Sequence, residues 1–328
     1  MRSIVSSAFA VILFLCLSGC VEQQVGSKNL FAVDFAPDIT LRYKMVFDRA
    51  MGISLGESDK KKQSQKTTET LSLVMAYKPI EIDPYGLSTI EVFCESAKVS
   101  RLSFTGQKLS SDAVKSLAGR KFTIQITPTG KIAEHSELTS LVKELGEKAF
   151  VSGDAKRKGR RKNADMIFDF VAMQLYFWES ISSIEKPLKG VDPGQSWTSI
   201  QHVPLPVPMR AMRETIYTLD KIDESPTGQN AIISSTYSLS KAKAGNWPII
   251  PYSGKFGLKG SILALLRNYK YKWLKGTGSE VFNIDRGVLQ SRIEEYEMEI
   301  DADLLLPLGD SKPKLTIKQT MSIKLLED

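Results

Sequence analysis

The sequence is poor in cysteine and histidine, with three cysteines and two histidines among 328 residues. Cys94 is the only cysteine after residue 20, so no disulfide framework is predicted. A chain of this length can bury a core large enough to fold without one. His135 and His202 have no partner at metal-ligand spacing, so we expect no metal site and no cofactor.

Long apolar runs are also scarce, and the clearest is the ten-residue stretch Ala8–Leu17. A membrane-spanning helix needs about 20 apolar residues, so this stretch is too short to span a bilayer. It follows Arg2 and precedes the small residues Ser18 and Gly19, which is the pattern of a secretory signal peptide. The sequence therefore predicts export, either by signal cleavage or with the leader kept as an anchor.

The leader ends in Leu17-Ser18-Gly19-Cys20, which resembles the lipobox of bacterial lipoproteins. The resemblance implies a signal peptide over residues 1–19, lipid on Cys20 and a tether over residues 20–38. Several acyl chains on one cysteine anchor a protein stably to a membrane. Val21, where some families carry an aspartate for inner-membrane retention, implies the outer membrane, facing the periplasm.

The positive charge is concentrated in one segment. Without Arg2, 43 basic and 37 acidic residues remain, and one run supplies six of the basic ones. The rest of the chain is balanced, so the broad basic footprint of a nucleic-acid-binding protein is missing. The run is interpreted either as a solvated loop or as a patch for anionic head groups or an acidic partner. It consists of Lys156, Arg157, Lys158, Arg160, Arg161 and Lys162.

Alternating apolar residues predict strands along most of the chain. In the clearest example, Leu315, Ile317, Met321, Ile323 and Leu325 alternate with polar residues, which is typical of an antiparallel sheet with one wet face. Further strands are predicted from Ile39, around 71–77, 90–94 and 122–126, and then around 215–219, 231–239, 281–284 and 296–300. The order of strand and turn motifs is similar in residues 39–150 and 188–328, which is consistent either with a degenerate duplication or with the usual repetition in β proteins.

Two helices are predicted between these halves. One lies near 137–149 after Ser136, and the other runs from a cap at Asn163 to about Lys186. The second helix is apolar nearly all round, so it must be covered on most sides. The predicted fold is α+β and mainly antiparallel β, with a curved sheet or incomplete barrel covered or plugged by helices. The segment 151–187, basic run and apolar helix together, connects the halves.

The apolar helix is the main internal candidate for a site. Its side chains are interpreted as core, or as the wall of a cavity for a lipid or other apolar ligand, because methionine and aromatic residues adapt to varied apolar partners. The candidate ligand-binding residues are Phe170, Met173, Phe177 and Trp178.

The segment 118–132, with Pro193–Trp197, looks like a family of uncharacterised secreted bacterial proteins. This resemblance implies no activity for the chain. A curved antiparallel sheet around helices is also similar in architecture to periplasmic lipoprotein-sorting proteins, and architecture does not fix function.

Catalytic groups are scarce. Gly52–Gly56 matches the G-x-S-x-G motif of the hydrolase nucleophile elbow. A polar, Lys-rich segment follows it instead of the helix that the motif needs. We expect a non-catalytic, membrane-anchored envelope lipoprotein that binds a lipid or apolar ligand. The alternatives are a structural or assembly protein that acts through envelope partners, and a hydrolase using Ser54, His135 or His202.

Overall fold

The computed structural model describes most of the chain after residue 28. The described residues are 29, 31–54, 65–102, 112–148, 150–151, 160–162, 165–179, 190–206, 209–244, 256–258, 262–305 and 312–327. The predicted signal peptide, Cys20 and Lys156–Lys158 lie outside them, as do the side chains of Arg160, Arg161 and Lys162.

The described chain is mostly strand. In order, the elements are β1 (Leu41–Ser54), β2 (Gln65–Ile82), β3 (Ser88–Leu102), η2 (Ala113–Leu117), β4 (Lys121–Ile126), β5 (Ile132–Glu134), α2 (Ser136–Lys148), β6 (Phe150–Val151), β7 (Arg160–Lys162), α3 (Ile167–Tyr176), β8 (Ser196–His202), β9 (Met212–Ser225), β10 (Gly228–Leu239), β11 (Phe256–Leu258), η4 (Ile262–Leu265), β12 (Leu266–Asn283), β13 (Val288–Leu304) and β14 (Lys314–Leu326).

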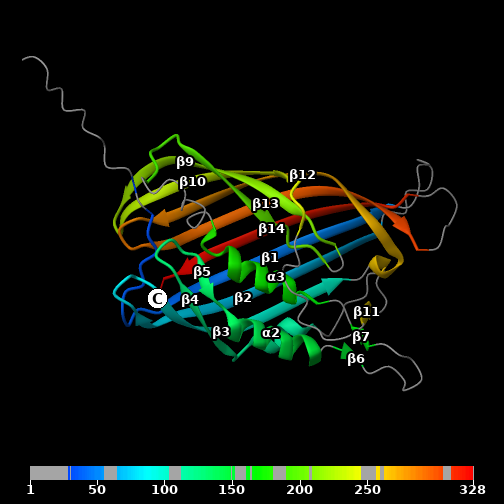
Figure 1. Ribbon diagram of the computed structural model, residues 1–328, viewed down its shortest axis with the longest axis horizontal. Helices are drawn as coiled ribbons and strands as arrows, with labels where there is room; N and C mark the ends of the chain where they lie inside the picture. Colours follow the sequence, from blue (N-terminus) through cyan, green and yellow to red (C-terminus); the bar gives the residue numbers. More distant parts are fainter. Residues whose placement is uncertain are drawn as a thin grey trace, which may run out of the picture.

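An eleven-stranded antiparallel sheet dominates the fold, in the order β5-β4-β3-β2-β1-β14-β13-β12-β10-β9-β8. It curves without closing, and α2 and α3 lie against one face (Figure 1). The first and last long strands pair at its centre, where Arg42–Ser54 runs beside Lys314–Leu326. The predicted fold class, a curved antiparallel sheet covered by helices, is confirmed.

Each half of the chain forms its own meander within this sheet. Strands β1 to β5 lie in sequence order on one side, and β8, β9, β10, β12, β13 and β14 follow the same sense on the other. The link between them runs from edge strand β5 to edge strand β8 and includes α2 and α3. The same order of strands in both halves is compatible with a duplication, which stays a hypothesis.

The two faces of the sheet differ as the alternation predicts. In β14 the side chains of Leu315, Ile317 and Ile323 are buried, while Lys318 and Lys324 face solvent. Period-two side-chain direction places every second residue on the same face. The inner face therefore carries the core, and the outer face is polar.

The predicted tether differs from the structure. Phe31, Val33 and Phe35 are buried in the core, and Val33 and Asp34 donate backbone hydrogen bonds to Pro128 and Gly287. Ile39, predicted to open the first buried strand, is 48% exposed and precedes β1. The apolar side chains at 31, 33 and 35 explain the difference, because burying them stabilises this segment against the sheet.

The connecting region also differs in part. Helix α2 matches the predicted helix, but α3 begins at Ile167 after Met166, later than the predicted cap at Asn163, which lies outside the described residues. The basic run is interpreted either as a solvated loop or as a binding patch. Its residues Arg160–Lys162 form β7 between β6 and β11 in a small second sheet, so this part is not a loop, and the patch stays a prediction. The glycine-rich segment Gly276-Thr277-Gly278 lies inside β12.

Two apolar clusters fill the inner face. The larger packs α2, α3 and the segment 31–35 against strands of both halves, so the halves share one core. The smaller lies among β1, β12, β13, β14 and the segment 203–211. Among the described residues, no helix combines the length and apolar character needed to cross a membrane.

Candidate functional site on the inner face of the sheet

Helix α3 lies in the larger apolar cluster and is apolar on most sides. Ten residues, IFDFVAMQLY, form it, and all but Val171 and Leu175 are buried. A helix with so little polar surface is stable only where other elements cover it. The inner face of the sheet provides that cover, so α3 fills the hollow of the curve.

All four candidate ligand-binding residues lie in this packed region. Phe170 and Met173 are on α3, and Phe177 and Trp178 follow it directly. None is more than 2% exposed. The structure thus places them in the core, and an apolar ligand would reach them only if α3 moved away from the sheet.

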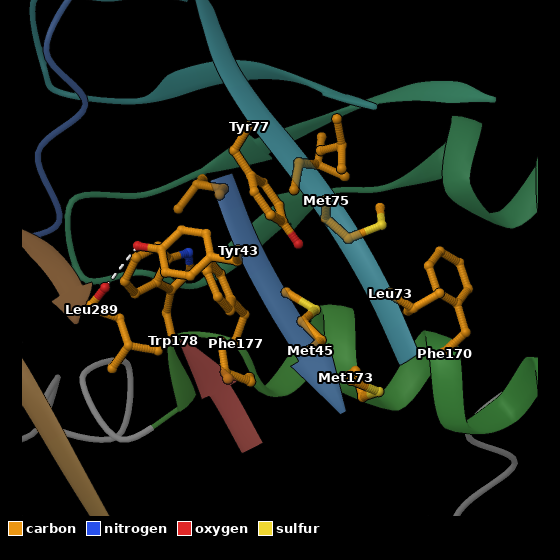
Figure 2. Close-up of a cluster of buried hydrophobic side chains, with 14 of the residues drawn as sticks. Tyr43, Met45, Leu73, Met75, Tyr77, Phe170, Met173, Phe177, Trp178 and Leu289 are labelled. Carbon is orange, nitrogen blue, oxygen red and sulfur yellow. Dashed lines mark hydrogen bonds between the residues drawn. The ribbon is translucent and has the colours of Figure 1, made fainter. Parts of the chain in front are cut away.

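Aromatic rings from β1 and β2 hold the end of α3. The Tyr43 and Phe177 rings meet edge to face at 4.5 Å, and Tyr77 stacks on Phe177 at 5.0 Å (Figure 2). Trp178 lies edge-on to Phe35 at 6.2 Å. Such pairs each contribute about 0.5–1.5 kcal/mol beyond area burial. The Tyr43 hydroxyl donates to the Leu289 carbonyl at 2.8 Å, so this ring is also fixed at its polar end.

Polar side chains of α3 bind the sheet as well. The Gln174 side-chain oxygen accepts a hydrogen bond from the Tyr77 hydroxyl at 2.7 Å, and its nitrogen donates to the Met45 sulfur at 3.7 Å. The Tyr176 hydroxyl donates to the His202 carbonyl on β8. Helix α3 is therefore held to strands on both sides of the sheet.

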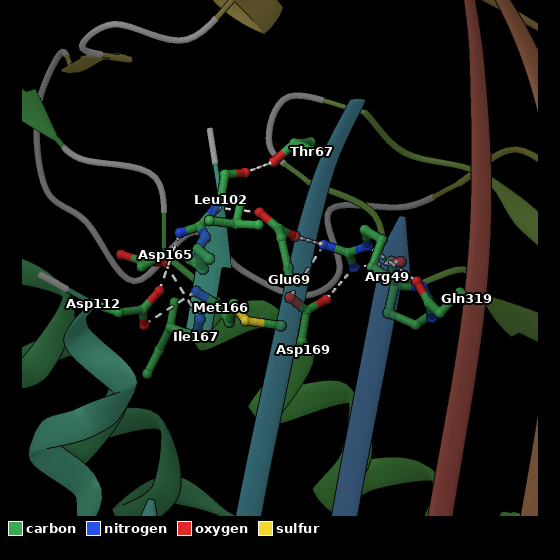
Figure 3. Close-up of polar contacts among 12 residues, drawn as sticks. Arg49, Thr67, Glu69, Leu102, Asp112, Asp165, Met166, Ile167, Asp169 and Gln319 are labelled. Carbon is green, nitrogen blue, oxygen red and sulfur yellow. Dashed lines mark hydrogen bonds and ion pairs between the residues drawn. The ribbon is translucent and has the colours of Figure 1, made fainter. Parts of the chain in front are cut away.

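A buried charge network binds the first turn of α3 (Figure 3). Arg49 on β1 donates to Asp169 on α3 at 2.5 Å and to Glu69 on β2 at 2.9 Å. It also donates to the Gln319 side chain and the Pro204 carbonyl, each at 3.1 Å. All three nitrogens of the guanidinium are thus used, which offsets the cost of burying the charge.

Arg101 on β3 extends the network to the other side of β2. It pairs with Glu69 and with Asp112, the latter at 3.1 Å. Asp112 in turn accepts from the backbone N–H of Val114 at 3.0 Å and of Met166 at 3.4 Å. The network therefore fixes both η2 and the start of α3.

The pKa values of the carboxyl groups in this network are shifted in opposite directions. Burial raises the pKa of Asp169 to about 6, an effect that the Glu69 charge strengthens and Arg49 opposes. Burial also raises the pKa of Asp112 to about 6. For Glu69, burial alone would raise the pKa, but Arg101 and Arg49 together lower it. Glu69 is therefore the anionic centre, while Asp169 and Asp112 take up protons in mildly acidic solution.

A second buried network lies at the other end of α3. Arg292 on β13 donates to the Tyr176 carbonyl at 2.6 Å, where a cation complements the negative end of the helix dipole. Arg292 also pairs with Glu294, and Arg213 on β9 pairs with the same carboxylate at 2.9 Å. Burial opposes ionisation of Glu294, but Arg213 and Arg292 outweigh it and lower its pKa to about 2.

The buried donors without a hydrogen-bond partner within the described part of the chain include Trp178 Nε1 and one terminal nitrogen of Arg213. The Arg213 guanidinium lies over the Tyr237 ring at 4.4 Å, which compensates part of its charge. The Trp178 indole N–H lies among apolar groups. A buried donor without an acceptor costs about 1–3 kcal/mol, so an acceptor at this position would be stabilised.

The remaining sequence candidates lie on separate elements, although the His202 carbonyl contacts α3 through Tyr176. Ser54 ends β1, His135 precedes α2 and His202 ends β8, where burial lowers its pKa. Cys94 is buried on β3, and burial raises its thiol pKa to about 11, which keeps the thiol protonated and unreactive near neutral pH. The described residues hold no group of three or more His, Cys, Asp or Glu suited to a metal ion.

Sequence reasoning missed the charged residues of the inner face, although a signal was present. Arg49 falls in the same alternating phase as Met45 and Phe47, and Glu69 falls in phase with Leu71 and Leu73. A charge in the inward phase of a strand is buried unless the strand bulges. Such a position predicts an internal ion pair, but it does not say which strand supplies the partner.

The chain was compared with known families, curated proteins and solved structures. The family described as "Family of unknown function (DUF6263)" matches residues 92–261, more than half of the chain. This chain belongs to that family. The match includes 118–132 and 193–197, the segments that predicted an uncharacterised family. No curated protein matched.

Solved structures resemble this family member only distantly. A lipovitellin structure, titled for its lipid–protein interactions, aligns with a TM-score of 0.41 and 9% identity, over 90% of this chain and 26% of its own. The chain thus spans about a quarter of lipovitellin. The TodX monoaromatic hydrocarbon channel (deltaS2 mutant) gives 0.25 and 8%, over 91% and 93%. An outer membrane channel from Pseudomonas putida F1 gives 0.20 and 8%, over 90% and 98%. With TM-scores below 0.5, these likenesses carry no argument.

Proposed function

We propose that this protein is a non-catalytic envelope protein, anchored by lipid on Cys20, that binds an apolar ligand or lipid between α3 and the inner face of its sheet. The observation that carries the proposal is the position of α3 in the chain. It belongs to the link between the edge strands, so it can leave the hollow without unpairing any strand of the eleven-stranded sheet.

The composition of the interface supports this proposal. Met45, Met75 and Met173 belong to the same apolar cluster as the aromatic rings that hold the end of α3 (Figure 2). Methionine side chains repack around different apolar shapes more readily than branched residues do. The indole N–H of Trp178 would supply one polar contact for an acceptor group on the ligand. A mostly apolar wall with one such donor suits a lipid tail or a similar molecule.

Uptake of an apolar fluorescent probe tests the ligand site. The chain from residue 20, with Cys20→Ser, holds every described residue and is the material to use. Gln174→Ala removes the bonds to Tyr77 and Met45, so it favours the state with α3 displaced. We expect about 5- to 30-fold tighter probe binding, because loss of about 1–2 kcal/mol of α3 docking raises the binding-competent fraction.

The matched control is Ile317→Val, in the smaller apolar cluster away from α3. It costs a similar 0.5–1.5 kcal/mol of stability, roughly, and leaves the α3 contacts intact. Unchanged probe binding is expected there. No uptake by any variant, together with a native mass that shows no co-purified lipid, would refute the ligand site.

The filled interior favours a second candidate, a structural or assembly protein that acts through envelope partners. Such a protein needs no cavity, and α3 would serve as permanent core. This function predicts co-purification with envelope proteins that is lost when Lys156–Lys158 and Arg160–Lys162 are neutralised. Retained co-purification after neutralisation would argue against a role for the basic run.

A further inference from the structure

A corner of the sheet exposes apolar side chains at the end of the sheet where the N-terminal segment lies (Figure 1). Ile80, Ile82 and Tyr85 lie at the tip of the β2–β3 hairpin, and Ile39 precedes β1 beside it. Tyr85 is 88% exposed and Ile80 is 55% exposed. We call these four residues the Tyr85 corner. Its exposure costs free energy in water, because apolar surface there stays hydrated.

The turn that carries Tyr85 is held in one conformation. Asp83 accepts hydrogen bonds from the backbone N–H of Tyr85 and of Leu87, both at 2.8 Å. Gly86 adopts a φ of +84°, and a Cβ there would come within 2.8 Å of Pro128. The tyrosine is therefore presented by a rigid turn, which lowers the entropy lost when it binds a surface.

The chain enters the fold at this end of the sheet. Val33 donates to the carbonyl of Pro128, the residue that also packs against Gly86. Figure 1 shows the blue N-terminal segment at the same end as the β2–β3 turn. Eight residues lie between Cys20 and Asn29, so the chain reaches at most about 30 Å from one to the other in any conformation. A lipid on Cys20 thus keeps this end close to the membrane.

We propose that the Tyr85 corner is a membrane-contact surface that inserts into the interface of the bilayer holding the Cys20 anchor. The inference rests on the proposed anchoring. Glu81 and Asp83 flank the exposed side chains, so the contact suits a zwitterionic lipid surface and is weakened by anionic lipid. Tyrosine and isoleucine fit this location, since tyrosine prefers the headgroup level and isoleucine the acyl boundary.

The test uses the chain from residue 20 coupled through its Cys20 thiol to a maleimide lipid in phosphatidylcholine vesicles. Cys94 is buried, so Cys20 is the thiol that reacts. This coupling makes the result independent of whether the cell lipidates Cys20, which the mass of the membrane-extracted protein decides separately. Tyr85→Trp is the reporter, and Ile216→Trp, at an exposed site on β9, is the matched control.

Brominated acyl chains should quench the tryptophan of Tyr85→Trp by at least twofold more than that of Ile216→Trp, after subtraction of the native tryptophans. The difference should fall when Ile80→Ser and Ile82→Ser are added and when anionic lipid replaces phosphatidylcholine. Ile200→Ser and Ile293→Ser, equally exposed elsewhere, should leave it unchanged. Equal quenching at positions 85 and 216 overturns the proposal. An equal fall of the quenching difference with Ile200→Ser and Ile293→Ser overturns it as well.

Discussion

At the scale of single residues, buried arginines define the inner face of this protein. Arg49 and Arg292 bind opposite ends of α3, and each shares a carboxylate with a second arginine. Replacing a complete buried ion pair by apolar residues is often neutral, but removing one partner is costly. These networks therefore fix where α3 docks more than they add net stability.

Glu294→Gln should destabilise the protein by about 3–5 kcal/mol, because Arg213 and Arg292 lose their shared carboxylate. Denaturant unfolding measures this loss. Glu297→Gln is the control on the same strand, since Glu297 faces outward toward Lys318. It should change the free energy of unfolding by less than about 0.5 kcal/mol. Similar losses in the two variants would show that the inner network is energetically unimportant.

Asp169 predicts a pH dependence of stability. Its pKa is about 6 when folded and 3.8 in a solvated reference, so the folded state binds the proton more tightly. Protonation of Asp169 therefore stabilises the folded state relative to the unfolded chain. This stabilisation is absent above the folded pKa and grows as pH falls from about 6 to about 4, toward about 3 kcal/mol. Lowering pH from 7.5 to 5 should therefore stabilise the wild-type chain more than Asp169→Asn. Identical profiles would contradict the raised pKa.

At the scale of elements, two glycines let β12 pack closely against its neighbouring strands. Neither glycine has a positive φ, so the reason for glycine is space and not backbone conformation. A Cβ on Gly276 would lie 2.2 Å from the Glu295 carbonyl and 2.5 Å from Tyr296 Cβ. One on Gly278 would lie 2.2 Å from the Tyr237 hydroxyl. The Gly276-Thr277-Gly278 motif thus makes room for tyrosines of the neighbouring strands β10 and β13.

Gly276→Ala should cost about 1–3 kcal/mol or more through overpacking against the backbone of β13. Gly52→Ala in β1 is the matched control, because no atom lies within 4 Å of its added Cβ. We expect that change to be neutral or stabilising, since alanine restricts the unfolded chain. Thermal unfolding of both variants checks the difference, and equal midpoints would contradict it.

At the scale of the whole molecule, the central pairing of β1 with β14 joins the two ends of the chain. The larger apolar cluster holds residues of both halves, among them Leu71, Tyr217 and Phe282. Neither meander can bury its inner face without α3 and the other half. We therefore expect the fold to unfold as one cooperative unit.

Unfolding should accordingly show a single transition by two separated probes. Cys94 reports on the first half, and all four tryptophans lie at or after residue 178. Thiol exposure of Cys94 and tryptophan fluorescence should give the same denaturant midpoint within error. Two separated midpoints would mean that the halves unfold as independent domains.

The sequence by itself determined the long strands, their faces and the apolar helix, because side-chain periodicity is local, while the anchor on Cys20 stays a prediction. It did not predict the segment 31–35 as core or β7 as a strand, because such short pieces gain stability only from distant partners. Tertiary structure alone decided that Arg49 meets Asp169 and that α3 fills the hollow. Those contacts join residues far apart in the chain, and only the folded sheet brings them together.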